Sequence, residues 1–135
     1  TKAMFAESFV QLGLIPGDGG AWFLPRAVGF SNASLMALTG DPVKAEEALR
    51  IGLVSQVVEV EELLITAQRI ASRIAANPPH AVRLTKQLLR GSARSSLDEM
   101  LDKSAAFQAV CHAEPDHHEA IAAFFDKRSG NYRQD

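Results

Sequence analysis

Several features that mark particular protein classes are scarce in this sequence of 135 residues. Its single cysteine, Cys111, excludes an internal disulfide and a zinc site built from four cysteines. Its uninterrupted apolar runs are far too short to cross a bilayer. Fourteen Lys and Arg residues against sixteen Asp and Glu give a net charge of -2, without the excess that nucleic-acid and membrane-surface binders carry. We therefore expect neither nucleic acid nor a membrane among its partners.

What remains is the composition of an ordinary folded domain. Hydrophobic residues make up 47% of the chain and charged residues 22%, which argues against disorder. The length is close to that of one domain, and the sequence contains no internal repeat. The chain begins at Thr1 and soon reaches a glycine turn flanked by apolar residues. This abrupt start leads us to expect that the chain is part of a longer one.

Residues 1–30 predict little regular structure around that turn. A short strand is expected near Met4 and Phe5, followed by irregular structure. The segment 16–20, Pro-Gly-Asp-Gly-Gly, is typical of a tight turn because glycine tolerates positive φ angles. A short helix over 21–27 follows, and Pro25 shortens or kinks it.

From residue 31 onward the pattern predicts helices and one short strand. The expected helices span 32–38, 41–50, 60–76, 80–91, 97–112 and 117–127, with the strand at 53–58. Asp41 and Pro42 are expected to open the second of these helices. Capping boxes are predicted for two of the others, Ser96 with Glu99 and Asp116 with Glu119. Because the strand has no partner in this region, we expect it to pair with sheet outside the chain.

The glycine turn is the most suggestive chemical feature. It matches neither the dinucleotide fingerprint nor the phosphate-binding P-loop. Its backbone amides, at a helix N-terminus, suit an anion or a polarised carbonyl, although a tight turn for close helix packing explains the glycines equally well. Asp18 within it is either a general acid/base or a carboxylate that accepts hydrogen bonds from the turn.

Three histidines, His112, His117 and His118, lie near Cys111 and invite a metal hypothesis. No pair of them has the i,i+4 spacing of a helical zinc site, and Pro115 interrupts the segment. We interpret the segment as a solvated connection between helices and expect no metal site.

Basic residues gather near the end of the sequence. Lys127, Arg128 and Arg133 flank Tyr132 and follow the apolar pair Phe124-Phe125. Cations of this kind often decorate a helix C-terminus, where the helix dipole favours them. The alternative is a clamp for a phosphate-bearing ligand, with an aromatic ring for stacking.

Taken in order, these segments resemble the crotonase superfamily, the enoyl-CoA hydratase/isomerase family, over essentially the whole chain. The motifs are Phe5-x-x-x-Phe9-Val10-x-Leu12-Gly13-Leu14-Ile15-Pro16-Gly17-x-Gly19-Gly20, Leu24-Pro25-Arg26-x-Val28-Gly29, Leu38-Thr39-Gly40-Asp41, Glu47-Ala48, Gly52-Leu53-Val54 and Ala123-Phe124-Phe125-Asp126-Lys127-Arg128. Members of this family are roughly twice this length, so the resemblance implies the second half of such an enzyme. It implies a mainly α chain with one or two short strands, the helical trimerisation part of a ββα-spiral α/β fold. Residues 1–30 would end the spiral core, and 31–135 would form the helical C-terminal region.

The resemblance also implies an activity. Family members act on acyl-CoA thioesters through an enolate held in an oxyanion hole, whose amides would lie in the absent half. No cofactor is expected beyond the coenzyme A of the substrate. A cytoplasmic homotrimer or hexamer is expected, and this chain by itself is expected to be inactive.

The acids of the family match this sequence only in part. Phe9 stands where hydratases carry their second glutamate, and a phenyl ring cannot move a proton, so a double-bond isomerase is favoured over a hydratase. Family isomerases place one acid in the Pro-x-Gly turn, usually at the position of Gly17. Asp18, one residue later, is therefore the candidate catalytic acid. Glu7 is the second choice, with a surface or strand-end role expected for it.

The resemblance further implies substrate contacts, and the departures from it leave one rival. The substrate-binding candidates are Phe9, Gly17, Gly19, Phe124 and Lys127. The rival is a non-catalytic oligomerisation or acyl-CoA-binding module that kept the fold and lost the acids.

Overall fold

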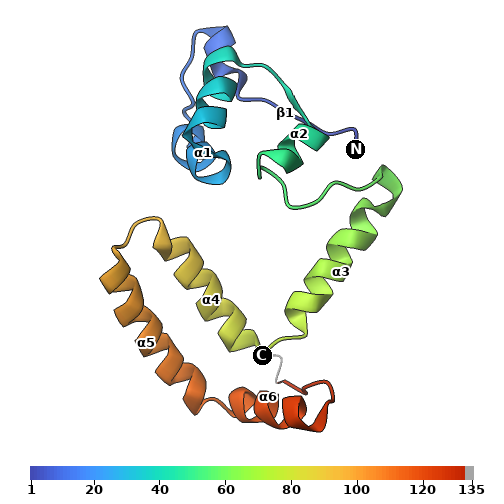
Figure 1. The fold of residues 1–135 in the computed structure, drawn as a ribbon, viewed down its shortest axis with the longest axis vertical. Helices are drawn as coiled ribbons and strands as arrows, with labels where there is room; N and C mark the ends of the chain where they lie inside the picture. The colour runs from blue at the N-terminus through green and yellow to red at the C-terminus, as the bar shows by residue number, and fades with distance from the viewer. Residues whose placement is uncertain (133–135) are drawn as a thin grey trace. The chain divides into compact units, whose positions relative to one another are not determined.

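The computed structural model describes residues 1–132, which fall into two compact units, Thr1–Thr66 and the segment from Ala67 onward (Figure 1). The described part is mainly helical and contains two short strands, which confirms the predicted class. Its elements are β1 (Met4–Phe5), the 3-10 helix η1 (Ser8–Leu12), α1 (Gly20–Thr39), β2 (Val43–Lys44), α2 (Ala45–Arg50), the 3-10 helix η2 (Val60–Glu62), α3 (Leu63–Ala75), α4 (Pro79–Ser92), α5 (Leu97–Ala113) and α6 (Pro115–Asp126).

The strand pairing in the first unit departs from the prediction. β1 pairs antiparallel with β2, with Met4 opposite Lys44 and Phe5 opposite Val43. The prediction that a helix opens at Asp41 is wrong, because residues 43–44 form β2 and α2 begins only at Ala45. The helix-opening signal of Asp41 and the following proline is outweighed because β-branched Val43 can join a ladder with β1.

The predicted strand over 53–58 is also wrong. The segment is not part of either strand, and its first backbone amides turn back onto the end of α2. The N–H groups of Leu53 and Val54 donate to the carbonyl of Ala48, at 2.8 and 3.3 Å. A β-branched segment without a neighbouring strand cannot satisfy its backbone in a ladder, so here it takes a local alternative.

The two helices predicted over 21–27 and 32–38 form the two parts of one element, α1. The division lies at Gly29, whose φ of 77° and ψ of 160° are not helical. This backbone conformation is open essentially to glycine alone, which explains the kink better than Pro25 does. Val28, Ala33 and Met36 of α1 are buried. They make α1 the central packing element of the first unit.

The short helix η1 packs along α1 and so fixes the approach to the glycine turn. The side-chain amide of Gln11 donates to the carbonyl of Thr39, 2.9 Å away, near the end of α1. At the end of η1, Gly13 and Leu14 donate to the carbonyls of Val10 and Phe9. Residues before and after the turn are therefore held to the same helix.

In the second unit α4 packs against α5, and α5 against α6 (Figure 1). The capping box at the start of α5 is confirmed, because Ser96 Oγ accepts from the Glu99 amide and Glu99 accepts from the Ser96 amide. The second capping box is wrong. Pro115 fits the first turn of a helix, so α6 begins there, with Glu114 as its N-cap. Glu119 instead pairs with Arg128 beyond the end of α6.

The core of the described residues is small. Its buried apolar residues are Val28, Ala33, Met36, Ala45, Ala48 and Ala123. On α3, by contrast, Leu63, Leu64 and Ile65 are each more than 60% exposed. Much of the apolar surface of α3 is therefore exposed in this chain.

Candidate functional site

The glycine turn lies between η1 and α1, in the first unit. Gly19 is the N-cap of α1, and its φ of 97° lies in the region that favours glycine. Its carbonyl accepts the first helical hydrogen bonds, from the amides of Trp22 and Phe23 at 2.9 and 3.0 Å. The turn thus presents its backbone and side chains at the N-terminus of the first part of α1, the end that carries positive partial charge.

Asp18 is exposed at this helix terminus. Its Oδ1 accepts a hydrogen bond from the Gly20 amide at 2.9 Å, so the carboxylate does bind the turn, as one of the two alternatives expected. Such a bond orients the side chain and leaves its second oxygen in solvent contact, where it can meet a ligand. Asp18 is therefore an oriented and exposed carboxylate.

Glu7 lies closer to this turn than the sequence predicts. It follows β1 and is the N-cap of η1, yet its Oε1 is buried and has no hydrogen-bond partner within residues 1–132. A methyl group on Gly20 would overlap Glu7 Oε1, lie 2.8 Å from Glu7 Cδ and lie 3.1 Å from Asp18 Oδ1. The carboxyl groups of Glu7 and Asp18 therefore meet over the same backbone atom.

The environment of Glu7 favours its neutral form. Burial, and then the negative charge of Asp18, raise the pKa of Glu7 above its ordinary value. The buried Oε1 does not fit the expected surface role, whereas the position of Glu7 just after β1 does fit the expected strand-end role. No local signal reveals it, because the burial arises only when α1 folds against η1 and brings residues thirteen positions apart, 7 and 20, into contact.

The other substrate-binding candidates of the first unit lie near Glu7 and Asp18 in the sequence. Phe9 is half-buried within η1 and offers no group that moves a proton. Gly17 is exposed, and Gly19 lies so close to the Phe23 ring that a Cβ there would be 3.1 Å from it. The structure thus brings Phe9, Gly17, Asp18 and Gly19 into one short region, with Glu7 beside them.

Phe124 and Lys127 belong to the second unit. The Phe124 side chain is 79% exposed and meets the ring of Phe125 edge to face, with centroids 5.8 Å apart. Lys127 ends α6 with a φ of 53°, in the left-handed region. Both side chains are open to a ligand.

The other members of the basic cluster are placed differently. The Arg128 guanidinium binds the carboxylates of Glu119 and Asp126, at 2.5 and 3.2 Å, so it is a structural cation. The hydrogen bonds that Arg128 and the Asn131 amide donate to Glu119 lower the pKa of Glu119 to about 2. Arg133 lies outside the described residues.

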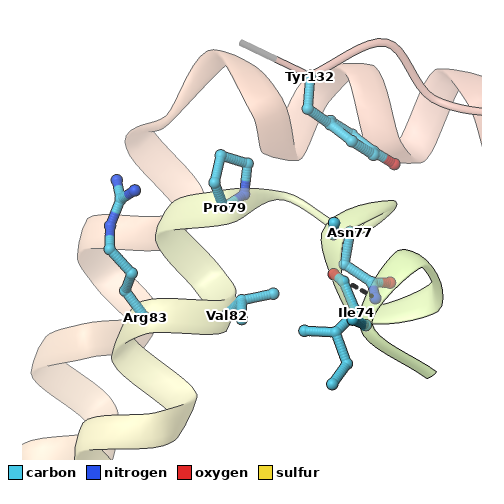
Figure 2. A pocket seen from close by; sticks show the side chains of 8 residues that line it. Ile74, Asn77, Pro79, Val82, Arg83 and Tyr132 are labelled. Carbon is cyan, nitrogen blue, oxygen red and sulfur yellow. Dashed lines mark hydrogen bonds between the residues drawn. The ribbon is translucent and has the colours of Figure 1, made fainter. Parts of the chain in front are cut away.

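A cavity of about 420 Å³ lies in the second unit, between the end of α3 and the start of α4 (Figure 2). It is lined by Ala71, Ile74, Ala75, Asn77, Pro79, Val82, Arg83 and Tyr132. The Asn77 side chain does not offer its N–H groups to a ligand, because Nδ2 donates to the carbonyls of Arg73 and Ile74, at 2.8 and 3.2 Å. The mostly apolar lining suits a hydrophobic group rather than a phosphate.

The histidine segment lies where α4, α5 and α6 meet. The rings of His112 and His117 stack with centroids 4.7 Å apart, and His80 Nδ1 lies 3.0 Å from Glu114 Oε1. Within residues 1–132 no group of three or more His, Cys, Asp or Glu side chains is arranged to hold a metal ion. In the same part of the chain no helix is long and apolar enough to span a membrane.

Comparison with known proteins decides the family. The model of the enoyl-CoA hydratase/isomerase family matches residues 1–135. The chain belongs to this family. It is 38% identical to the 1,2-epoxyphenylacetyl-CoA isomerase of Escherichia coli, covering 97% of this chain and 50% of that protein. It is 40% identical to the short-chain-enoyl-CoA hydratase of Clostridium acetobutylicum, covering 95% of this chain and 49% of that protein.

Solved structures of the family agree with this assignment. The enoyl-CoA hydratase of Bacillus anthracis superposes with a TM-score of 0.91 at 34% identity, over 95% of this chain and 50% of that one. The chain spans about half the length of the curated relatives that it matches, and it aligns with roughly their C-terminal half. The helical architecture therefore corresponds to one half of the crotonase fold.

Proposed function

We propose that these residues form the second half of an acyl-CoA site in an enzyme that moves a carbon–carbon double bond, with Asp18 as the proton carrier. The observation that carries this proposal is the placement of Asp18, exposed and oriented by the Gly20 amide at the N-terminus of α1. Phe9 stands where a hydratase glutamate is expected and cannot carry a proton. Asp18 is therefore the exposed acid of the turn that can do so.

The chemistry requires one carboxylate. Asp18 takes a proton from C2 of a 3-enoyl thioester, the C2–H bond breaks, and its electron pair spreads over the thioester as an enolate. The same carboxyl then returns the proton at C4, and the double bond moves to C2–C3. The enolate oxygen needs hydrogen-bond donors, which we expect in the part of the relatives that this chain does not cover. We therefore expect no turnover from the 135-residue chain by itself.

The names of the relatives support this class of substrate. One relative is named as a CoA-ester isomerase and another as an enoyl-CoA hydratase. In our proposal Gly17, Gly19 and Phe9 contact the acyl part of the substrate, whereas Phe124 and Lys127 contact the coenzyme A. An exposed aromatic ring and an exposed cation suit the adenine and the phosphates of coenzyme A. No cofactor is needed beyond that coenzyme A.

The organisation of the protein is part of the same proposal. Residues 1–30 serve the reaction, and 31–135 serve mainly assembly into a homotrimer or a hexamer, in the cytoplasm. The exposed apolar side chains of α3 support assembly, since such a surface is stabilised by contact with another chain. Sedimentation velocity of the native polypeptide tests this assembly. A monomer at micromolar concentration would contradict the proposed homotrimer or hexamer.

The test of the catalytic role is Asp18→Asn in the native polypeptide that carries this chain. We expect turnover of a 3-enoyl-CoA to fall by about 10²- to 10⁴-fold, because the amide cannot accept the proton. Binding of coenzyme A thioesters, measured by calorimetry, is expected to persist. The matched control is Asp41→Asn, an exposed aspartate beyond the end of α1, which should leave turnover unchanged. Equal turnover in Asp18→Asn and the unmodified protein would contradict the proposal.

A second candidate function is a non-catalytic acyl-CoA-binding or oligomerisation module. Phe9 favours it, because it removes an acid that the hydratases use. Under this alternative the native polypeptide binds coenzyme A thioesters with no turnover of either a 2-enoyl-CoA or a 3-enoyl-CoA. The two candidates therefore separate in the same pair of measurements.

A further inference from the structure

The contact over Gly20 gives the site a second carboxyl group that the family resemblance does not assign. Glu7 and Asp18 come from opposite sides of the glycine turn, and both reach the space above the Gly20 α-carbon. Oε1 of Glu7 is buried with no partner among residues 1–132. A buried carboxylate without a hydrogen bond is costly, whereas a neutral carboxyl at the same place is much less so.

We propose that Glu7 is a positioning residue for Asp18: it stays protonated beside it, so that the pair carries a single negative charge at the N-terminus of α1. The catalytic meaning of this pair rests on the function proposed above, but the coupling of the two groups does not. When Glu7 loses its proton, a second negative charge appears beside the place where the enolate forms. Turnover then falls, because like charges repel.

Asp18 is the charged neighbour that acts on the pKa of Glu7. Besides these two acids, the charged residues of the first 39 positions are Lys2 and Arg26. Arg26 is held elsewhere, since its guanidinium lies 3.3 Å from the centre of the Trp22 ring and donates to the Trp22 carbonyl. On β2 and α2, which pack with β1, the charged residues are Lys44, Glu46, Glu47 and Arg50. Of these, Arg50 is paired with Glu47.

Physical causes support the protonated form. Burial is the larger reason that the pKa of Glu7 is raised, and the charge of Asp18 is the second. Glu7 Oε1 is buried whereas Asp18 is exposed, so the proton stays on Glu7.

Carbon-13 NMR of the carboxyl groups in the native polypeptide that carries this chain tests the coupling without any assay of turnover. We expect the Glu7 signal to titrate above the ordinary glutamate value of 4.5. In Asp18→Asn its midpoint moves down, because the neighbouring charge is gone. In Gly20→Ala it also moves down, because the added methyl displaces the flexible carboxyl into water. Gly17→Ala is the matched control, since nothing but a carbonyl 3.9 Å away surrounds that Cβ and the Glu7 midpoint should stay.

Two outcomes would overturn the inference. One is a Glu7 carboxyl that titrates like an ordinary glutamate in the unmodified chain. The other is a raised midpoint that Asp18→Asn leaves unchanged, since burial alone would then explain it. Both outcomes leave the proposed function standing, whereas unchanged turnover in Asp18→Asn removes that function and leaves the coupling intact.

The pH dependence of turnover by the native polypeptide tests whether Glu7 acts through Asp18. We expect kcat/KM for a 3-enoyl-CoA to decline on the alkaline side as Glu7 ionises. Glu7→Gln keeps the shape of a neutral carboxyl and cannot ionise, so this variant retains turnover and loses that decline. A merely structural Glu7 predicts a lower melting temperature for Glu7→Gln with an unchanged profile, and that result would overturn the role.

Discussion

At the scale of single residues, the glycine turn shows how a few positions place two carboxyl groups. Asp18 is oriented by the Gly20 amide, and Glu7 is buried because Gly20 has no side chain to exclude it. The residue types are visible in the sequence, and so is the departure at Phe9. The approach of both acids to Gly20 is not, since it depends on how η1 packs along α1.

Glu119 gives a prediction at the same scale. Its carboxylate accepts hydrogen bonds from Arg128 and from the Asn131 amide, and these lower its pKa from 4.5 to about 2. A lowered pKa in the folded state means that the stabilisation is present above 4.5 and is lost as the pH falls toward 2. We expect Glu119→Gln to be less stable than the unmodified chain at neutral pH, and the difference to shrink over that range.

Urea unfolding of both proteins between neutral pH and acid measures this difference. Glu61→Gln, in the exposed segment η2, is the matched control and should show no such narrowing. A Glu119→Gln difference that stays constant with pH would contradict the assigned contacts.

At the scale of elements, the start of α5 is the clearest case of local sequence deciding structure. Both hydrogen bonds of the capping box between Ser96 and Glu99 are formed, at 3.3 and 2.8 Å. We expect Ser96→Ala to lower the free energy of unfolding by about 1 kcal/mol, because an orphan helix amide loses its partner. Ser95→Ala, one residue earlier, is the control and should change stability by less than about 0.5 kcal/mol in urea unfolding. Equal losses in the two variants would contradict the cap.

Elements with strong local signals were predictable, and elements that depend on distant partners were not. The helices α3, α4 and α5 follow the apolar periodicity and caps closely. By contrast, β2 exists because β1 is there to pair with it, and 53–58 lacks a strand because no such neighbour is present in the described residues. The same distinction applies to the two acids. The turn that holds Asp18 is formed by neighbouring residues, whereas the burial of Glu7 Oε1 depends on contact with the distant Gly20.

At the scale of the whole molecule, the chain has a small core and many exposed apolar side chains on its helices. It covers about half of the two relatives compared above, one named as a CoA-ester isomerase and the other as an enoyl-CoA hydratase. Composition and charge alone exclude several classes of protein, but the ordered motifs identify the family. The reaction itself depends on which acids remain in the site.

The measurement that tests this account most directly follows a 3-enoyl-CoA and a 2-enoyl-CoA with the native polypeptide, recording both double-bond migration and hydration. We predict migration of the 3-enoyl-CoA without hydration of the 2-enoyl-CoA, because one exposed carboxyl can move a proton between carbons whereas Phe9 replaces the second acid of a hydratase. Hydration of the 2-enoyl-CoA at a rate comparable to migration would contradict the central claim and would show that another group supplies the second acid.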